Sequence, residues 1–343
     1  MELSERKREV LFAVVENYIV TAEPVGSAQI AKAGGLSVSP ATVRHVMAEL
    51  EEMGLILRPH TSAGGVPTDL AYRFYVDRLM QLKPLTSGVQ DEIRNRVETG
   101  AATVSDILKE TCKLISVQTH QPGMIVSPRA DETRLKHIQF VRLKNNLALG
   151  VLVTSSGIVE NKVLELSEPY TQEQLNQMHN FLNERIAGRA VSEVRREILL
   201  EMKQAHQNYD RLLSQALILG ERTMAEEGRE VHVEGQSLLF DEPEFSNARA
   251  MQGILRTLEE KNQVLALLDQ AIRNPGVKIL IGEEIHCGEV NGLSLITSTY
   301  SDAEGNRGVL GVIGPTRLDY ARIVPLVEFT SQMVTDTLGQ RSE

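Results

Sequence analysis

The side chains that could carry catalytic or metal chemistry are scattered along this sequence. Histidines stand at positions 45, 60, 120, 137, 179, 206, 232 and 286, and no two of them have the i, i+3 or i+4 spacing of metal ligands on one helix face. His286 and Cys287 are neighbours, but no CxxC or HExxH pattern accompanies them. A loop that follows a strand explains this pair better, so the sequence predicts no metal site.

Patterns for cofactor binding and nucleophilic catalysis are also missing from the sequence. The glycine-rich stretch 308–314 has neither the GxxxxGK[ST] order of a phosphate-binding loop nor the GxGxxG order of a dinucleotide site. Glu283 and Glu284 could act as paired carboxylates, but no nucleophile or second acid stands beside them. No serine lies in a GxSxG motif. We therefore predict no catalytic residue, no cofactor and no enzymatic activity.

The stretch from Ser39 to Gly54 has the pattern of a helix that recognises DNA. Ser39 is a favourable N-cap, Pro40 suits the first helical position, and Gly54 can end the helix. Apolar residues at 43, 46, 47, 50 and 53 form one buried face. The opposite face consists of Ala41, Arg44, His45, Ala48 and Glu52. An arginine flanked by small residues on such a face suits a helix that enters the DNA major groove.

The segments around this helix predict a winged helix-turn-helix. A short helix and a glycine-bearing turn precede it, and a strand and a hairpin loop follow it. The expected elements in chain order are a helix over 4–20, a helix over 24–32, the turn 33–36, the helix described above, a strand over 55–58, a wing loop over 59–68 and a helix over 68–80. Arg73 in the last helix can face a phosphate. The alternative interpretation of these residues is a three-helix module that packs against another protein.

The rest of the chain predicts an α+β region. Two clusters of strands are expected, with helices before, between and after them. The strands are expected over 137–143, 147–153 and 158–166, and again over 277–281, 293–300 and 308–314, with a final helix over 320–338. We expect both clusters to form one sheet that a helical insertion interrupts. The insertion could mediate self-association, act as a lid or bind a partner.

Composition restricts the function classes further. The 343-residue chain has a net charge of −10, and residues 1–80 contain eight Lys and Arg against ten Asp and Glu. Bulk charge therefore supplies no affinity for DNA, so phosphate contacts must be local. The sequence contains no apolar run of membrane-spanning length and no secretory signal, and it has two cysteines. We expect a cytoplasmic protein without disulfides and without a membrane partner.

The first 80 residues closely resemble the bacterial heat-inducible transcription repressor family, HrcA. The resemblance is carried by specific blocks: 18–27 (YIVTAEPVGS), 39–44 (SPATVR), 47–51 (MAELE), Gly54-Leu55, 59–64 (PHTSAG), 66–69 (VPTD) and 72–77 (YRFYVD). Beyond residue 80, length and the interrupted α+β layout are similar to the GAF-like domain of the family with its inserted dimerisation domain. The resemblance implies a winged-helix domain over 1–83, a GAF-like domain over 89–188 and 274–343, and a mainly helical dimerisation insert over 189–273.

This resemblance implies a homodimeric repressor of class I heat-shock operons, those for the chaperonin and the DnaK-type chaperone. The family binds an inverted-repeat operator called CIRCE, and the GroE chaperonin promotes the active state of the repressor. Chaperonin occupied by unfolded clients would therefore leave the repressor inactive. The chain departs from the family pattern at Gly65, where arginine is usual in the wing, and at His45, where asparagine is common.

We expect the DNA contacts to come from three segments. Arg44 is the candidate for a bidentate guanine contact, and Ser39, Thr42 and His45 lie beside it on the same helix. The wing contributes His60, Thr61, Ser62 and Gly64, and Arg73 is a candidate for a backbone contact. Two other hypotheses remain open: a ligand-responsive winged-helix regulator with a polar pocket among residues 103–166 and 277–314, and a protein-interaction scaffold that needs no Arg44.

Overall fold

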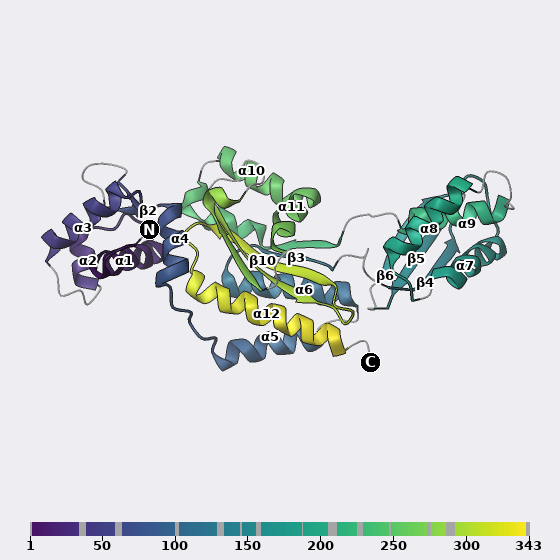
Figure 1. Cartoon of the computed structure of the whole chain (residues 1–343), viewed down its shortest axis with the longest axis horizontal. Coiled ribbons are helices and arrows are strands. Elements are labelled where there is room, and N and C mark those ends of the chain that lie inside the picture. The colour runs from purple at the N-terminus through teal and green to yellow at the C-terminus, as the bar shows by residue number, and fades with distance from the viewer. Residues whose placement is uncertain are drawn as a thin grey trace.

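The computed structural model contains a winged helix, a central sheet domain and a smaller α+β unit arranged along its longest axis (Figure 1). It describes residues 2–33, 39–58, 64–99, 103–128, 134–144, 146–155, 159–186, 188–204, 211–224, 229–246, 248–272, 276–285 and 292–340. No helix among these residues is long and apolar enough to cross a membrane.

The N-terminal elements form the expected winged helix. They are α1 (Glu5–Thr21), α2 (Ser27–Ala33), α3 (Pro40–Glu52), β1 (Ile56–Leu57), β2 (Val66–Pro67), α4 (Asp69–Phe74) and a π-helical turn, η1 (Tyr75–Leu79). The two short strands pair antiparallel and form the base of the wing. Apolar residues of α1 and α3 meet in a common core with Ile30 of α2. Leu70 of α4 is 47% exposed, and Ala71, Tyr72 and Tyr75 face the core instead.

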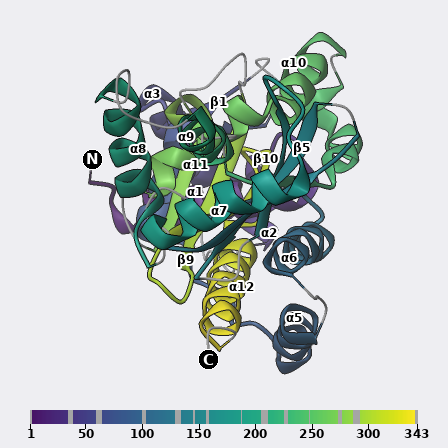
Figure 2. The same cartoon turned by 90° about the vertical axis from the view of Figure 1, so that its right-hand side faces the viewer.

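The central domain is a five-stranded antiparallel sheet with helices on both faces. Its strand order is β7-β3-β10-β9-β8. The strands are β3 (Gly123–Val126), β7 (Val231–Glu234), β8 (Val277–Ile281), β9 (Leu293–Ser301) and β10 (Arg307–Pro315). One face carries α5 (Ser87–Thr99), α6 (Val104–Thr119) and α12 (Tyr320–Gln340), which group together in Figure 2. The other face carries α10 (Ala248–Glu259) and α11 (Lys261–Ile272), and the short helices η3 (Gln236–Asp241), η4 (Pro243–Phe245) and η5 (Gly282–Glu284) complete the domain.

The two strand clusters do not share a sheet, so the expectation of one continuous sheet is wrong. The first cluster forms a separate three-stranded sheet in the order β4-β5-β6. This unit comprises β4 (Leu135–Arg142), β5 (Leu147–Thr154), β6 (Val159–Glu165), α7 (Gln172–Ile186), α8 (Val191–Gln204) and α9 (Arg211–Met224). It has a hydrophobic core of its own and lies in the chain between β3 and β7. The segment that interrupts the central sheet therefore contains strands as well as helices, and it lies earlier in the chain than 189–273.

One face of this small sheet is rich in aliphatic side chains and is not covered by any described helix. Ala148, Gly150, Leu152 and Thr154 of β5 are buried under the helices, so alternate residues point to the opposite face. That face carries Val141, Leu147, Leu149, Val151, Val153, Val159 and Val163, called the apolar face below, with the polar residues Gln139, Asn161 and Glu165 among them. Val159 is 51% exposed and Val163 is 59% exposed. A contiguous exposed apolar surface of this kind marks an interaction site more often than an isolated exposed side chain does.

The winged helix and the central domain share one hydrophobic core. Buried residues of α1, α3 and α4 belong to the same cluster as those of α6 and α12. The Tyr72 and Tyr320 rings meet at this junction with centroids 6.2 Å apart. At the edge of this junction, Arg317, which precedes α12, bonds to the carboxylates of Glu242 and Glu244.

The two junction tyrosines are expected to respond oppositely to loss of the hydroxyl group. The Tyr72 hydroxyl is buried without a hydrogen-bond partner among the described residues, whereas that of Tyr320 bonds to Ser294 Oγ at 2.7 Å and Thr316 O at 2.6 Å. An unpartnered buried hydroxyl costs about 1–3 kcal/mol, and a made bond contributes about 1 kcal/mol. Tyr72→Phe should therefore raise the free energy of unfolding by about 1 kcal/mol, and Tyr320→Phe should lower it by a similar amount. Urea unfolding of both variants measures this, and destabilisation by Tyr72→Phe would show that its hydroxyl has a partner.

The same tyrosines predict sensitivity to alkaline pH. Burial raises the pKa of Tyr72 and of Tyr320 above the ordinary value for tyrosine. Their contribution to stability is therefore complete below about pH 10, the ordinary tyrosine pKa, and is lost as the pH rises toward the folded-state pKa. Urea midpoints should fall above pH 10, and Tyr72→Phe should reduce that fall. An equal fall in the variant would assign the effect to other groups.

Candidate nucleic-acid interface

The helix α3 is fixed at both ends by the residues that the sequence indicated. Ser39 Oγ accepts a hydrogen bond from the Thr42 backbone N–H at 3.2 Å and lies 3.0 Å from Thr42 Oγ1. Gly54 follows the helix with a φ of 73°, a left-handed conformation that favours glycine. Val43, Val46, Met47 and Leu50 bury the inner face. The outer face is therefore held in one orientation by its packing.

Arg44 and His45 project from this outer face. Both side chains are exposed, and so is Ala41 one turn earlier. Arg44 forms no ion pair with any other described residue. His45 Nε2 lies 3.3 Å from Glu49 Oε1, and 76% of the His45 side chain remains exposed. The structure thus brings Ser39, Thr42, Arg44 and His45 together on one helix end.

Carboxylates of α3 are paired with basic residues of neighbouring segments. Lys7 Nζ of α1 lies 3.1 Å from Glu49 Oε2, and Arg58 Nε at the start of the wing lies 3.3 Å from Glu51 Oε2. These pairs partly offset the acidic side chains that would repel phosphates near α3. They leave the net charge of the winged helix unchanged.

The wing is described only at its base. Gly64 is needed there because a Cβ would come within 2.6 Å of Pro24 and Val25 backbone atoms. Residue 65 points inward, since a Cβ on Gly65 would lie 2.6 Å from Ile56 Cγ2 and 2.8 Å from Met47 Cε. A missing arginine at 65 therefore removes no outward contact from this backbone. His60, Thr61 and Ser62 lie outside the described residues.

Arg73 lies at the domain junction, apart from the α3 face. Its Nε donates to Glu284 Oε1 at 2.8 Å, and its terminal nitrogens donate to the Ile279 carbonyl at 2.8 Å and to Asp77 Oδ1 at 3.3 Å. These partners tie α4 to β8 and η5 of the central domain. A phosphate contact by Arg73 remains a prediction, and it would have to replace some of these bonds.

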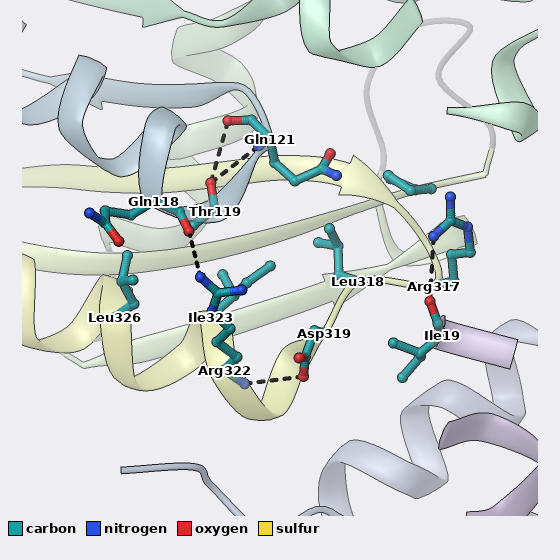
Figure 3. Close-up of a pocket in the computed structure, with 11 residues that line it drawn as sticks. Ile19, Gln118, Thr119, Gln121, Arg317, Leu318, Asp319, Arg322, Ile323 and Leu326 are labelled. Carbon is teal, nitrogen blue, oxygen red and sulfur yellow. Dashed lines mark hydrogen bonds between the residues drawn. The ribbon is translucent and has the colours of Figure 1, made fainter. Parts of the chain in front are cut away.

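A cavity of about 150 Å³ lies beside the same junction (Figure 3). Ile19 of α1 borders it on one side, and residues from the end of α6 and the start of α12 border it on the other. Arg322 donates to the Gln118 carbonyl at 3.2 Å, and Arg317 donates to the Ile19 carbonyl at 3.5 Å. The cavity is smaller than the roughly 300–1,000 Å³ of typical ligand pockets. Much of its polar lining is already bonded within the protein.

Sequence reasoning missed Lys7 and Glu49 as part of this surface. Lys7 belongs to α1, and it reaches Glu49 across the packed α1–α3 interface. The His45–Glu49 pair could have been found, because residues four apart on a helix are neighbours. The Lys7–Glu49 pair required the packing angle of the two helices.

Family models match both parts of the chain. The model described as "Winged helix-turn-helix transcription repressor, HrcA DNA-binding" matches residues 2–78. The model described as "HrcA protein C terminal domain" matches residues 105–324. The resemblance seen in the sequence is therefore confirmed over most of the chain.

Full-length relatives agree with these matches. The heat-inducible transcription repressor HrcA of Geobacter sulfurreducens is 44% identical, covering 98% of each chain. The HrcA repressor of Syntrophobacter fumaroxidans is 39% identical over 100% of this chain and 99% of its own. A crystal structure described as a hypothetical protein matches 99% of both chains with a TM-score of 0.63 and 21% identity, which shows the shared fold. The chain therefore belongs to the HrcA family of heat-inducible transcription repressors, which bind DNA through a winged helix and are not enzymes.

Proposed function

We propose that this repressor binds the inverted-repeat CIRCE operator as a homodimer and represses class I heat-shock operons in the cytoplasm. The observation that carries the proposal is the exposed α3 face, where Arg44 stands unpaired among the described residues beside Ala41 and His45. An arginine that no carboxylate among the described residues neutralises is available to guanine O6 and N7. Ser39 and Thr42 at the helix N-terminus suit phosphate oxygens, which position the helix in the groove.

The apolar face supports a homodimer. Its seven aliphatic side chains lie on one surface of a sheet whose opposite surface is already covered by helices. Burial against the same face of a second copy would remove this surface from water and relate the two winged helices by a two-fold axis. Such an axis matches the symmetry of an inverted repeat. We therefore assign dimerisation to the β4–β6 unit.

Regulation by the GroE chaperonin is proposed from the family resemblance. In this scheme the chaperonin promotes the DNA-binding form, and unfolded clients withdraw it during heat shock. The central domain, which we interpret as GAF-like, would then link the dimerisation unit to the winged helix without a small-molecule signal.

A duplex-binding experiment tests the proposed function. Labelled CIRCE duplex and a scrambled duplex are titrated with the full-length protein at two salt concentrations, with and without chaperonin. We expect a strong preference for the repeat that chaperonin increases. Equal, weak binding to both duplexes under all four conditions would reject the repressor proposal.

A second candidate function would use the junction cavity, whose volume of about 150 Å³ admits only a small ligand. A small molecule in it would contact α1 and α12 together, so it could bias the position of the winged helix. This ligand-responsive alternative predicts that a specific metabolite raises the melting temperature and changes operator affinity.

A further inference from the structure

His45 and Glu49 form the outer end of a three-residue chain that begins on α1. Lys7 Nζ contacts Glu49 Oε2 at 3.1 Å, and Glu49 Oε1 lies 3.3 Å from His45 Nε2. Lys7 and Glu49 are partly covered, whereas 76% of the His45 side chain is exposed. This series of contacts therefore links α1 to the DNA-facing surface of α3, at the position next to Arg44.

The carboxylate of Glu49 lies beside one particular nitrogen of His45, Nε2. An ionised carboxylate only accepts hydrogen bonds, so a proton on Nε2, the nitrogen 3.3 Å from Glu49 Oε1, is the arrangement that this contact favours. In the neutral imidazole the other nitrogen, Nδ1, is then an acceptor. Protonation converts Nδ1 into a donor while Nε2 still faces Glu49.

This change of Nδ1 alters which DNA groups His45 can bind. As an acceptor, Nδ1 suits the exocyclic amino groups of adenine and cytosine. As a donor, it suits guanine N7 and O6 or a phosphate oxygen. DNA is rich in acceptors with negative charge around them, so it favours the protonated form.

We propose that Glu49 is a positioning residue which orients His45 so that the protonated Nδ1 donates to an acceptor on the operator, making His45 a specificity-determining residue. The proposal rests on the proposed function, in which α3 enters the major groove. It implies that operator binding takes up a proton at each half-site and strengthens as the pH falls.

Charged groups of both signs lie near His45. Among the described residues, the carboxylate of Glu49 on the same helix faces His45, and Lys7 on α1 pairs with that carboxylate. Arg44, the preceding residue, disfavours a second positive charge nearby. The three groups Lys7, Glu49 and neutral His45 together carry no net charge, so protonation turns this cluster positive.

The competing explanation is that His45–Glu49 only stabilises α3. An i, i+4 pair of this kind contributes about 0.2–0.5 kcal/mol to a helix. That role would change thermal unfolding slightly and would leave the pH dependence of DNA binding untouched. The two explanations therefore predict different dependences of operator affinity on pH.

The test measures the affinity of full-length protein for the CIRCE duplex between pH 5.5 and 8.5. Wild type, His45→Asn and Glu49→Gln are compared, because asparagine retains polarity and removes titration. We expect wild-type affinity to rise toward low pH, by up to about tenfold per protomer for each pH unit over which the proton is taken up. His45→Asn should lose this component. Any contribution from His60 in the wing remains in that variant, so the difference isolates His45.

Glu49→Gln tests the positioning role. Glutamine retains the shape but can turn its NH2 group toward Nε2, so the pH-dependent gain in affinity should shrink, while the melting temperature stays close to that of wild type. An unchanged profile in Glu49→Gln would overturn the role of Glu49. Wild-type and His45→Asn profiles that coincide would overturn the whole proposal. Failure of both proteins to prefer CIRCE at any pH would instead reject the proposed function.

Two further measurements identify the acceptor. A phosphate contact should steepen the slope of log K against log salt at low pH by about 0.9 per protomer in wild type alone. A guanine contact should leave that slope unchanged. In that case, 7-deazaguanine substituted in the half-sites should abolish the pH-dependent gain.

Discussion

Replacing Arg44 with alanine is expected to abolish the preference for CIRCE over a scrambled duplex. Each bidentate arginine–guanine contact contributes about 1–3 kcal/mol of discrimination, and a homodimer makes two such contacts. The loss is therefore about 2–6 kcal/mol, or roughly 30-fold to 10⁴-fold in relative affinity. Binding to the scrambled duplex should change much less, because nonspecific affinity comes from phosphate contacts. Fluorescence titration of both duplexes measures the two affinities.

Two matched variants test whether the loss of preference is specific to the Arg44 side chain. Arg96→Ala removes one positive charge from an exposed position of α5 in the central domain and should leave the preference intact. Arg44→Lys keeps the charge but loses the planar fork, so it should retain nonspecific binding and lose discrimination. If Arg44→Ala prefers CIRCE as strongly as wild type does, Arg44 is not part of the interface. That result would favour the protein-interaction scaffold.

Leu149→Asp is expected to convert the homodimer into monomers and to weaken operator binding strongly. Leu149 lies in the middle strand of the apolar face, with Val141 and Val163 as its cross-strand neighbours. A carboxylate there would be buried without a partner in the dimer but hydrated in the monomer. Two separate half-sites would then bind independently, which removes an avidity of about 10²–10⁴. Sedimentation velocity and operator titration measure the two effects.

Control variants separate this effect from misfolding. Gln177→Asp adds the same charge to an exposed position of α7 and should leave the dimer intact. Val163→Asp changes a more exposed residue of the apolar face and should reproduce the effect of Leu149→Asp with less risk to folding. Dimers that persist in both apolar-face variants, with unchanged melting temperatures, would place the dimer interface elsewhere.

Local signals predicted the winged helix well. Ser39, Pro40 and Gly54 determine the ends of α3 through capping chemistry that is complete within a few residues. The strand over 277–281 was predicted with its observed bounds, because Gly276 and Gly282 flank a short apolar run. These elements depend little on distant parts of the chain.

The pairing of strands could not be read from the sequence. β5 and β10 are both rich in valine, leucine and glycine, yet β5 is buried on one face and β10 on both. Only the helices that cover them distinguish the two cases. The strands β3 and β7 were missed because each is four residues long and is defined by its partner in the sheet.

The DNA-contact residues were predictable only where they follow one helix. Arg44 and His45 share a face by helical periodicity alone. Arg73 was expected at a phosphate, but its nearest carboxylate belongs to Glu284, which is 211 positions away in the chain. The inward direction of residue 65 likewise depends on the wing backbone crossing Ile56 and Met47.

The core shared by the winged helix and the central domain has a consequence for how the repressor melts. Tyr72 is 1% exposed and Tyr320 is fully buried at the junction, so separating the two domains would expose aromatic surface on both sides. A fragment that ends near residue 83 should therefore be poorly soluble or partly unfolded by itself. In the whole chain, the winged helix should lose its structure in the same calorimetric transition as the central domain. The temperature at which repression is lost through unfolding would then depend on residues far from the operator.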